Sequence, residues 1–187
     1  MDRRDFLKTC GAGAMATSGL TAAIDSQAAC GADGKRSIDP DKLEETAYRH
    51  FIPGKLTCCE SILLAGCEAL GIESDLVPDI SLGLGGGVGF QGDTCGVLTS
   101  TAMVVSLAVA SKEKNYAKKK MQAVQAAGRI YCAFKEQFGA ADCRSLCGLD
   151  LTTLEGRKKL AETVKAQRCA ELVRTGAQLL AKELQGI

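Results

Sequence analysis

Cysteine content is the feature that most constrains this chain. The 187 residues include ten cysteines but one histidine, His50, and no tryptophan. No two cysteines are spaced as Cys-x-x-Cys, which excludes thioredoxin-like, zinc-ribbon and bacterial ferredoxin patterns. The missing Cys-x-x-Cys-His excludes c-type haem attachment, and a single histidine excludes a multi-histidine metal centre. Any shared site for these thiols must therefore use residues that are distant in the sequence.

The composition predicts an all-α fold. Hydrophobic residues make up 46% and charged residues 24%, which is enough apolar material for a packed core. Aromatic residues make up only 4% and there are three prolines, which favours packed helices over a β-sandwich. The net charge is +1, so there is no electrostatic case for nucleic acid as a partner.

We expect a helical bundle with a glycine-rich loop between the second and third core helices. Six glycines make residues 78–93 irregular, and His50 is interpreted as a helix-end residue rather than a ligand. The uncharged stretch 94–111 is too rich in Thr and Ser for a membrane span, so we expect a helix buried within the bundle. Apolar spacing, caps and glycine stops predict helices at about 40–51, 56–70, 94–110, 112–138 and 152–184, the last broken near Lys165, and a short turn at 143–147.

The N-terminal residues have the pattern of an export signal. Arg3 and Arg4 precede an uncharged, weakly hydrophobic stretch over residues 9–24, and Ser26-Gln27-Ala28 has the small-x-small form of a cleavage site. These features predict a twin-arginine signal peptide over residues 1–28, and hence a periplasmic or otherwise exported protein without an integral membrane span after signal removal.

The mature chain would then consist of a linker and one domain. We assign residues 29–40 to the linker and residues 41–187 to a cysteine-rich helical redox domain. Small residues precede Cys30 as in a lipobox, although Gln27 stands where an aliphatic residue is usual. A lipid anchor on Cys30 is therefore the alternative to simple cleavage.

Most of the nine mature cysteines fall inside predicted helices, which favours thiolates that converge across the bundle interior. Cys143 and Cys147 are four residues apart and would share a helix face, whereas Cys58 and Cys59 cannot point the same way. A buried free cysteine can also act only as a small hydrophobic residue, and this interpretation stays open for each one. It is weaker for all nine together, because an oxidising compartment penalises idle thiols.

Four segments, taken in order, resemble a known family. Thr57-Cys58-Cys59-Glu60-Ser61-Ile62-Leu63 resembles an N-C-A-E-x-V-L opening, and Gly85 to Gly89 followed by Thr94 to Ser100 resembles a glycine loop leading into CGAxxG. Phe138 to Cys143 resembles F-G-x-x-x-C, and Arg168 to Val173 resembles a final x-C-x-x-x-V helix. Together they resemble the C-GCAxxG-C-C family of redox-active proteins, which is related to the cysteine-rich domain of split-Soret cytochromes, over about residues 45–184.

The resemblance implies a redox site built from four signature cysteines, Cys58, Cys95, Cys143 and Cys169. In the cytochrome relative this domain is associated with an iron–sulfur cluster. The resemblance therefore implies a cluster of the [2Fe-2S] or [4Fe-4S] type as the cofactor. The residues themselves agree, because Cys95 begins a predicted helix whose N–H groups and dipole stabilise negative charge.

The glycines near Cys95 are candidate cofactor-binding residues. Without a Cβ, their N–H groups can approach the sulfurs, and we assign this role to Gly86, Gly87, Gly89 and Gly96. A glycine-rich crossover that only permits tight helix packing is the alternative. A nucleotide-binding phosphate loop is excluded, because Gly-x-x-x-x-Gly-Lys-Ser/Thr is absent and no strand is predicted before the loop.

The sequence thus predicts an exported protein that carries single electrons to a redox protein partner, rather than an enzyme that converts a substrate. One alternative is a copper(I) or zinc binding or storage protein, because nine mature cysteines exceed the needs of one four-ligand site. Another is a thiol–disulfide oxidoreductase that uses Cys58-Cys59 or the Cys143/Cys147 pair. A homodimer is left open, as are the roles of Cys59, Cys67, Cys132 and Cys147.

Overall fold

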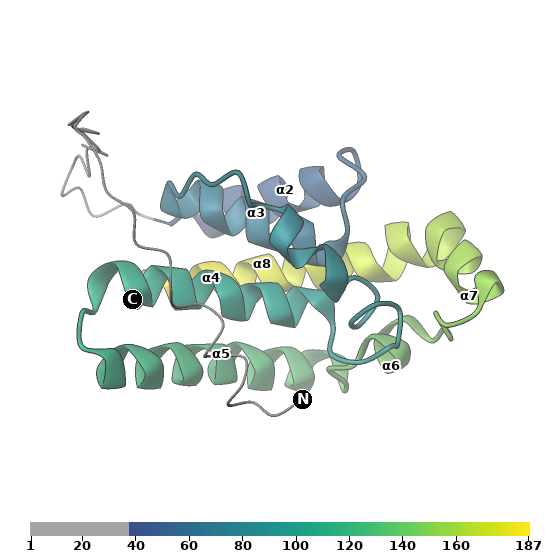
Figure 1. Cartoon of the computed structure of the whole chain (residues 1–187). Helices are drawn as coiled ribbons and strands as arrows, with labels where there is room; N and C mark the ends of the chain where they lie inside the picture. The colour runs from purple at the N-terminus through teal and green to yellow at the C-terminus, as the bar shows by residue number, and fades with distance from the viewer. Residues whose placement is uncertain (1–37) are drawn as a thin grey trace, which may run out of the picture. The chain divides into compact units, whose positions relative to one another are not determined.

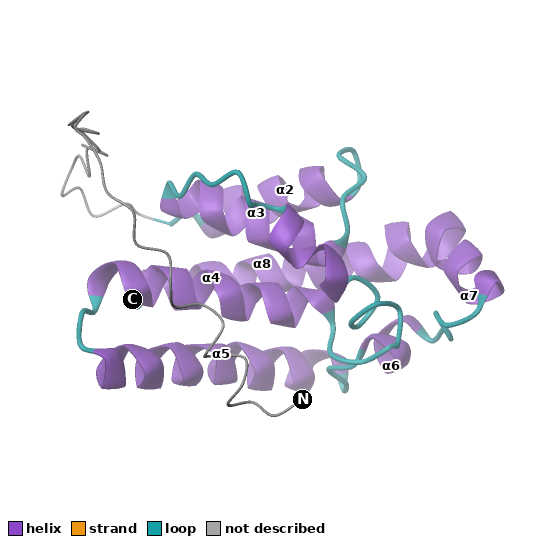
Figure 2. Cartoon of the chain, in the orientation of Figure 1, coloured by secondary structure: helices purple, strands orange, loops and turns teal. Residues whose placement is uncertain are grey.

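A computed structural model describes residues 38–187, which form helices and loops without a strand (Figures 1 and 2). This confirms the predicted all-α fold. The predicted signal peptide over residues 1–28, the linker as far as residue 37 and Cys30 lie outside the described residues. The helical elements are α2 (Pro40–Phe51), α3 (Cys58–Leu70), the 3₁₀ helix η1 (Asp79–Leu84), α4 (Gly96–Lys112), α5 (Tyr116–Phe138), α6 (Cys143–Cys147), α7 (Leu154–Lys159), the π-helical segment η2 (Leu160–Cys169) and α8 (Ala170–Gln185).

Helices α4 and α8 form the centre of the bundle. α8 packs against α2, α3, α4 and α5, while α4 packs against α3, α5 and α8 (Figure 1). Glycines allow the close approaches: a Cβ placed on Gly66 of α3 would lie 2.5 Å from Val104 Cγ2, and one on Gly176 of α8 would collide with Val97. The uncharged stretch is thus a central bundle helix, as predicted, but it is not covered on every side: Ser106 is exposed and Leu107 is 37% exposed. Within residues 38–187, no helix combines the length and the apolar character that crossing a membrane requires.

Two helix boundaries differ from the sequence prediction. α4 continues to Lys112 and α5 begins only at Tyr116, so the start at residue 112 that was predicted for the fourth helix was wrong. The reason is a local cap: the Asn115 side chain accepts a hydrogen bond from the Lys118 N–H at 3.1 Å. The glycine-rich region also contains the short helix η1, where irregular chain was expected.

The last helical region is divided into α7, η2 and α8. In η2 the backbone hydrogen bonds join residues that are five apart, one more than in an α-helix. At its end the N–H of Ala170 donates to the carbonyl of Lys165. π-helical turns are rare and occur often at functional sites. This one ends on Cys169 and lies, with α6, α7 and the glycine-rich loop, at one end of the bundle (Figure 1).

Candidate thiol site

The first thiols of the site stand at the start of α3. Thr57 caps this helix in a capping box with Glu60: the Thr57 N–H donates to Glu60 Oε2 at 2.9 Å, and the Glu60 N–H donates to Thr57 Oγ1 at 3.4 Å. Cys58 is the first residue of the helix and is half-buried. Cys59 is fully buried, and its thiol donates to the carbonyl of Ser81 in η1 at 3.2 Å. The two neighbouring thiols therefore have different surroundings.

Backbone pairing fixes Cys95 beside Cys143. Thr94 and Asp142 form an isolated antiparallel bridge. On one side of it the Cys95 N–H donates to the carbonyl of Ala141 at 2.9 Å, and on the other the Cys143 N–H donates to the carbonyl of Asp93 at 2.7 Å. The end of the glycine-rich loop is thereby joined to the segment between α5 and α6, which brings together two cysteines that lie 48 positions apart in the chain.

The glycines assigned to cofactor binding have unequal surroundings. Gly87 has φ +70°, and a Cβ there would collide with the backbone of Asp93, so the fold itself requires glycine. Gly96 lies against α3, where a Cβ would sit 2.8 Å from Cys58 Sγ. A Cβ on Gly86 would meet the Phe90 ring, whereas Gly89 is exposed with open space around its Cβ position. Three of these glycines thus have a packing role that is independent of any cofactor.

Helix α6 carries two more thiols on one face. Asp142 caps the helix by accepting the Ser145 N–H at 2.8 Å, and Gly148 ends it in the left-handed conformation. The thiols of Cys143 and Cys147 are one turn apart, and both are buried together with Leu151 in a small cluster. The next thiol of the site, Cys169, packs against this cluster as well as against the main core.

Two basic residues tie η2, and hence Cys169, to the rest of the site. Lys165 Nζ donates to the carbonyl of Leu56 just before α3 at 3.0 Å, and Arg168 Nε donates to the carbonyl of Leu146 in α6 at 3.2 Å. Arg168 also lies 4.9 Å from the centre of the Phe138 ring. The sequence analysis missed both residues, because their partners lie 109 and 22 positions away in the chain.

The thiols influence one another's ionisation. The pKa of Cys58 is raised. The interaction with the Cys59 thiol lowers this pKa, but the Cys95 thiol, burial, and the charges of Cys95 and Cys169 together raise it by more. The pKa of Cys143 is raised by burial, then by charge on Cys147, Cys58 and Cys169.

The pKa of Cys169 is also raised, although two positive charges lie close to its thiol. Burial, and then charge on Cys147, raises the pKa of Cys169 to about 11, although Lys165 and Arg168 act in the opposite direction. These interactions require proximity, and together with the backbone pairing and the shared buried cluster they group Cys58, Cys95, Cys143, Cys147 and Cys169, which we call the thiol site. Cys59 also interacts with Cys58, but its thiol donates to the carbonyl of Ser81, so we leave it out of the group.

Other candidates lie apart from the thiol site. Cys67 is buried in the main core on α3, and Cys132 is exposed on α5. His50 is in the last turn of α2 and hydrogen-bonds through Nε2 to Glu68 at 3.1 Å, as expected for a helix-end residue. Across residues 38–187, no three Cys, His, Asp or Glu side chains are already placed to hold a metal ion.

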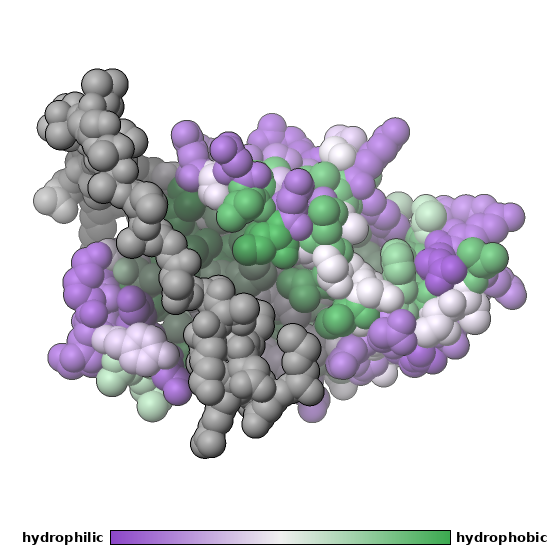
Figure 3. Space-filling model, viewed as in Figure 1, coloured by the Kyte–Doolittle hydropathy of each residue, from purple (hydrophilic) through white to green (hydrophobic). Residues whose placement is uncertain are grey.

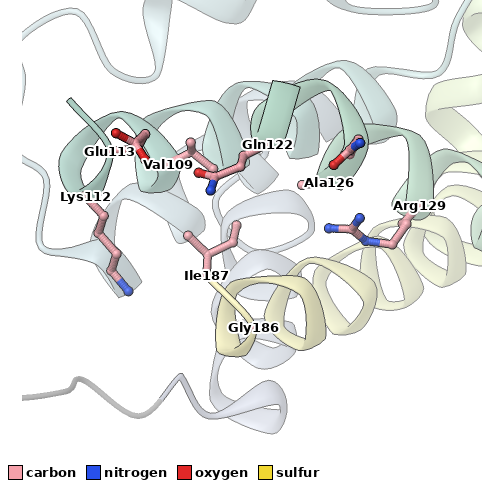
Figure 4. A pocket seen from close by; sticks show the side chains of 9 residues that line it. Val109, Lys112, Glu113, Gln122, Ala126, Arg129, Gly186 and Ile187 are labelled. Atoms are coloured by element: carbon pink, nitrogen blue, oxygen red, sulfur yellow. The ribbon is translucent and has the colours of Figure 1, made fainter. Parts of the chain in front are cut away.

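Two hollows in the surface of the described residues have no cysteine in their linings. One, of ≈ 290 Å³, lies where the C-terminal end of α4 meets α5 and the C-terminus and is lined by groups such as Lys112, Arg129 and Ile187 (Figure 4). That is the end of α4 opposite Cys95. An apolar groove of ≈ 640 Å³ runs between η1 and α4, within the apolar surface visible in Figure 3. The thiol site is therefore distinct from both.

The fold and the site define a class: an all-α protein in which cysteines from four dispersed segments meet at one end of a bundle. Residues 56–183 match the family described as "Putative redox-active protein (C_GCAxxG_C_C)". The chain belongs to this family. No curated protein and no solved structure matched the chain.

The family's description also corrects the alignment of one motif. It spells GCAxxG, not CGAxxG. Laid on residues 94–99, its cysteine falls on Cys95 and its alanine on Gly96, while Thr94 and Thr99 stand where the motif has glycine. The motif therefore places a small residue where Cys58 Sγ packs against the start of α4.

Proposed function

We propose that this protein is an exported electron carrier that holds an iron–sulfur cluster on Cys58, Cys95, Cys143 and Cys169. The observation that carries the proposal is the convergence of these four thiols from α3, the start of α4, α6 and the end of η2. The family's description as redox-active agrees with it. When bound, such a cluster accepts and donates single electrons.

The donor set fits a cluster better than a single ion. All five grouped side chains are thiols, the ligands that cluster iron prefers. A single tetrahedral ion holds its sulfurs about 3.8 Å apart, given metal–sulfur bonds of about 2.3 Å. A cluster needs wider spacing, because several irons and sulfides lie between its ligands. Within the part of the chain that the structure describes, no three Cys, His, Asp or Glu side chains are placed to hold a single ion. Rotation about the single χ1 torsion of each cysteine can complete the ligation.

The surroundings can offset the negative charge of ligating thiolates. Cys58 opens α3 and Cys95 stands at the N-terminal cap of α4, so the positive ends of two helix dipoles face the site. Lys165 and Arg168 add two full positive charges whose effect reaches Cys169. Because thiols must lose their protons to bind metal, these groups favour the bound state.

Electrons have a short path to the surface. Cys58 and Cys169 are only half-buried, whereas Cys95 is 3% exposed. The site is thus dry on its inner side and close to solvent on its outer side. This arrangement suits transfer to a redox protein partner that docks at this end of the bundle, without a substrate pocket.

The decisive experiment is anaerobic purification of the full chain with iron and acid-labile sulfide analysis, supported by absorption and electron paramagnetic resonance spectra. We expect iron and sulfide in matched amounts, bleaching on reduction, and loss of both from Cys95→Ser. Cys132→Ser, on the exposed face of α5, serves as the control and should keep its cluster. Protein that stays colourless and iron-free after anaerobic reconstitution contradicts the proposal.

A thiolate store for copper(I) or zinc is the second candidate. The observation in its favour is that the grouped thiols outnumber the four ligands of one cluster, with Cys147 inside the thiol site and Cys59 beside Cys58. Tight binding of more than about two copper(I) ions per chain, without iron, would favour it. Reductase turnover with a measurable dithiol potential would instead favour the oxidoreductase alternative.

A further inference from the structure

Cys147 is a buried thiol that the four-cysteine site leaves without a role. It is the last residue of α6 and is 8% exposed. Its sulfur has only distant hydrogen-bond partners, the carbonyls of Arg144 and Leu149, both at 3.9 Å. A buried cysteine can be simple packing, so the question is what its thiol faces.

Cys147 lies beside two proposed ligands of the thiol site, Cys143 and Cys169. Cys147 shares a small buried cluster with Cys143, and Cys169 packs against the same cluster. Cys143 and Cys147 are one turn apart on a short helix that is fixed at both ends, by the Asp142 cap and by Gly148. A rigid α6 therefore presents both sulfurs to η2 together. The cost of ionising Cys143 and Cys169 depends on Cys147, which agrees with this closeness.

The thiol site thus has two sides of unequal size. Cys58 and Cys95 come from the starts of α3 and α4, which meet where Cys58 Sγ lies against Gly96. Opposite them stand three thiols, from α6 and from the end of η2. A metal centre held by Cys143 and Cys169 would have a third sulfur at hand. On the α3/α4 side the neighbouring Cys59 thiol donates to the carbonyl of Ser81 in η1 instead.

We propose that Cys147 is a fifth ligating thiol of this site and can take the place of Cys143. The inference rests on the proposed thiolate site and deepens it. Both residues lie on one face of α6, one turn apart, so either sulfur can be offered to the same metal from that face. The structure assigns no such substitute to Cys95, whose backbone is fixed by the bridge to the α6 side.

The first test compares iron retention after anaerobic reconstitution in Cys143→Ser, Cys147→Ser, the double variant and Cys95→Ser. We expect each single α6 variant to keep most of its iron, with a changed spectrum in Cys143→Ser, and the double variant to lose it as Cys95→Ser does. This non-additivity is the signature of interchangeable ligands. Loss of iron from Cys143→Ser as complete as from Cys95→Ser would overturn the inference.

The second test does not depend on iron. The metal-free, reduced protein is titrated with Cd²⁺, and thiolate-to-metal absorption reports binding. Cys143→Ala and Cys147→Ala should each leave Cd²⁺ affinity within a few-fold of wild type, whereas the double variant should weaken it on the order of tenfold or more, because only then is no α6 thiolate left to bind. An affinity of Cys143→Ala as low as that of the double variant would overturn the inference.

Two comparisons keep the outcomes distinct. Cys67→Ala is the matched control, because Cys67 is also a buried cysteine but belongs to the main core on α3. Circular dichroism melting shows whether each variant folds, and Cys147→Ser provides a closer replacement if Cys147→Ala does not. Iron-free wild-type protein would contradict the proposed cluster, while the Cd²⁺ titration would still decide whether Cys147 is a ligand.

Discussion

Cys58 Sγ packs directly against the backbone of Gly96, at the point where α3 and α4 begin. A Cβ added at residue 96 would lie 2.8 Å from Cys58 Sγ and 3.1 Å from Cys59 Cβ. The first turns of the two helices can approach this closely only because one of them has no side chain there. This contact holds Cys58 next to Cys95 in the thiol site.

Gly96→Ala should therefore destabilise the protein although it adds a helix-favouring residue. Overpacking costs about 1–3 kcal/mol, which outweighs the gain of up to about 1 kcal/mol from replacing a helical glycine. Gly128→Ala in α5 is the control, because its added Cβ meets nothing within 4 Å and should raise stability. The measurement is urea unfolding of the metal-free protein, and equal stabilisation by both substitutions would refute the argument.

Alkylation should separate the thiols by burial. In reduced, metal-free, native protein, iodoacetamide should modify the exposed Cys132 first. Cys59 and Cys67 are 0% and 1% exposed and should react only after local opening. Peptide mass spectrometry over time gives the order, with urea-unfolded protein as the control in which the differences disappear. Early modification of Cys59 in native protein would show that α3 and η1 are not packed as described.

The sequence was sufficient for most of the fold but not for the joins between its parts. Helical periodicity and glycine stops placed α2, α3 and α4 within a few residues, because those signals are local. The bridge between Thr94 and Asp142 has no local signal, since it depends on which backbone groups meet after the bundle has formed. The π-helical hydrogen bonding of η2 likewise has no local sequence signal.

The candidate site was predictable only in part. Family resemblance selected Cys58, Cys95, Cys143 and Cys169, and the structure brings their thiols together. The four-residue spacing on α6 showed that Cys147 shares a face with Cys143, but it could not show that η2 covers that face. Such a contact between distant segments follows from tertiary packing.

The Asp142 cap should control the order of α6. Its carboxylate accepts the N–H of Ser145, which holds the pKa of Asp142 below its usual value. Asp142→Ala should cost about 1 kcal/mol, whereas Asp142→Asn keeps an accepting oxygen and should cost less. Unfolding of the metal-free protein measures both.

The lowered pKa also predicts a pH dependence. A depressed carboxyl pKa contributes stability that is present above the ordinary value of 3.8 and is lost as the pH falls through the folded-state value. The difference in stability between wild type and Asp142→Asn should therefore shrink below about pH 4. A constant difference from pH 6 to pH 3 would argue against an ionised cap.

Export should depend on the paired arginines. Replacing both Arg3 and Arg4 with lysine keeps the charge of the predicted signal but removes the twin-arginine pattern. We expect the full chain to accumulate unprocessed inside the cell, while Lys8→Arg, which also keeps the charge, should leave export unchanged. Fractionation and N-terminal mass analysis of the mature protein measure the effect and distinguish cleavage after Ala28 from lipidation of Cys30. Undiminished export of the double variant would remove the basis for the predicted signal.

Lys165 should tune the redox potential of the proposed site. Its ammonium group interacts with Cys58 and Cys169 and donates to the carbonyl of Leu56. A nearby positive charge favours the reduced, more negative state of a cluster, because net charge is one of the factors that set its potential. Lys165→Met keeps much of the apolar stem, removes the charge and should lower the midpoint potential.

Lys182→Met, in the last turn of α8, is the charge-matched control and should leave the midpoint potential unchanged. Potentiometric titration monitored by absorption gives both values. Because the Lys165 ammonium also contacts the Phe51 ring, a melting curve of each variant is needed to separate a charge effect from a loosened η2. An unchanged potential in a folded, fully loaded Lys165→Met protein would mean that this ammonium does not act on the site.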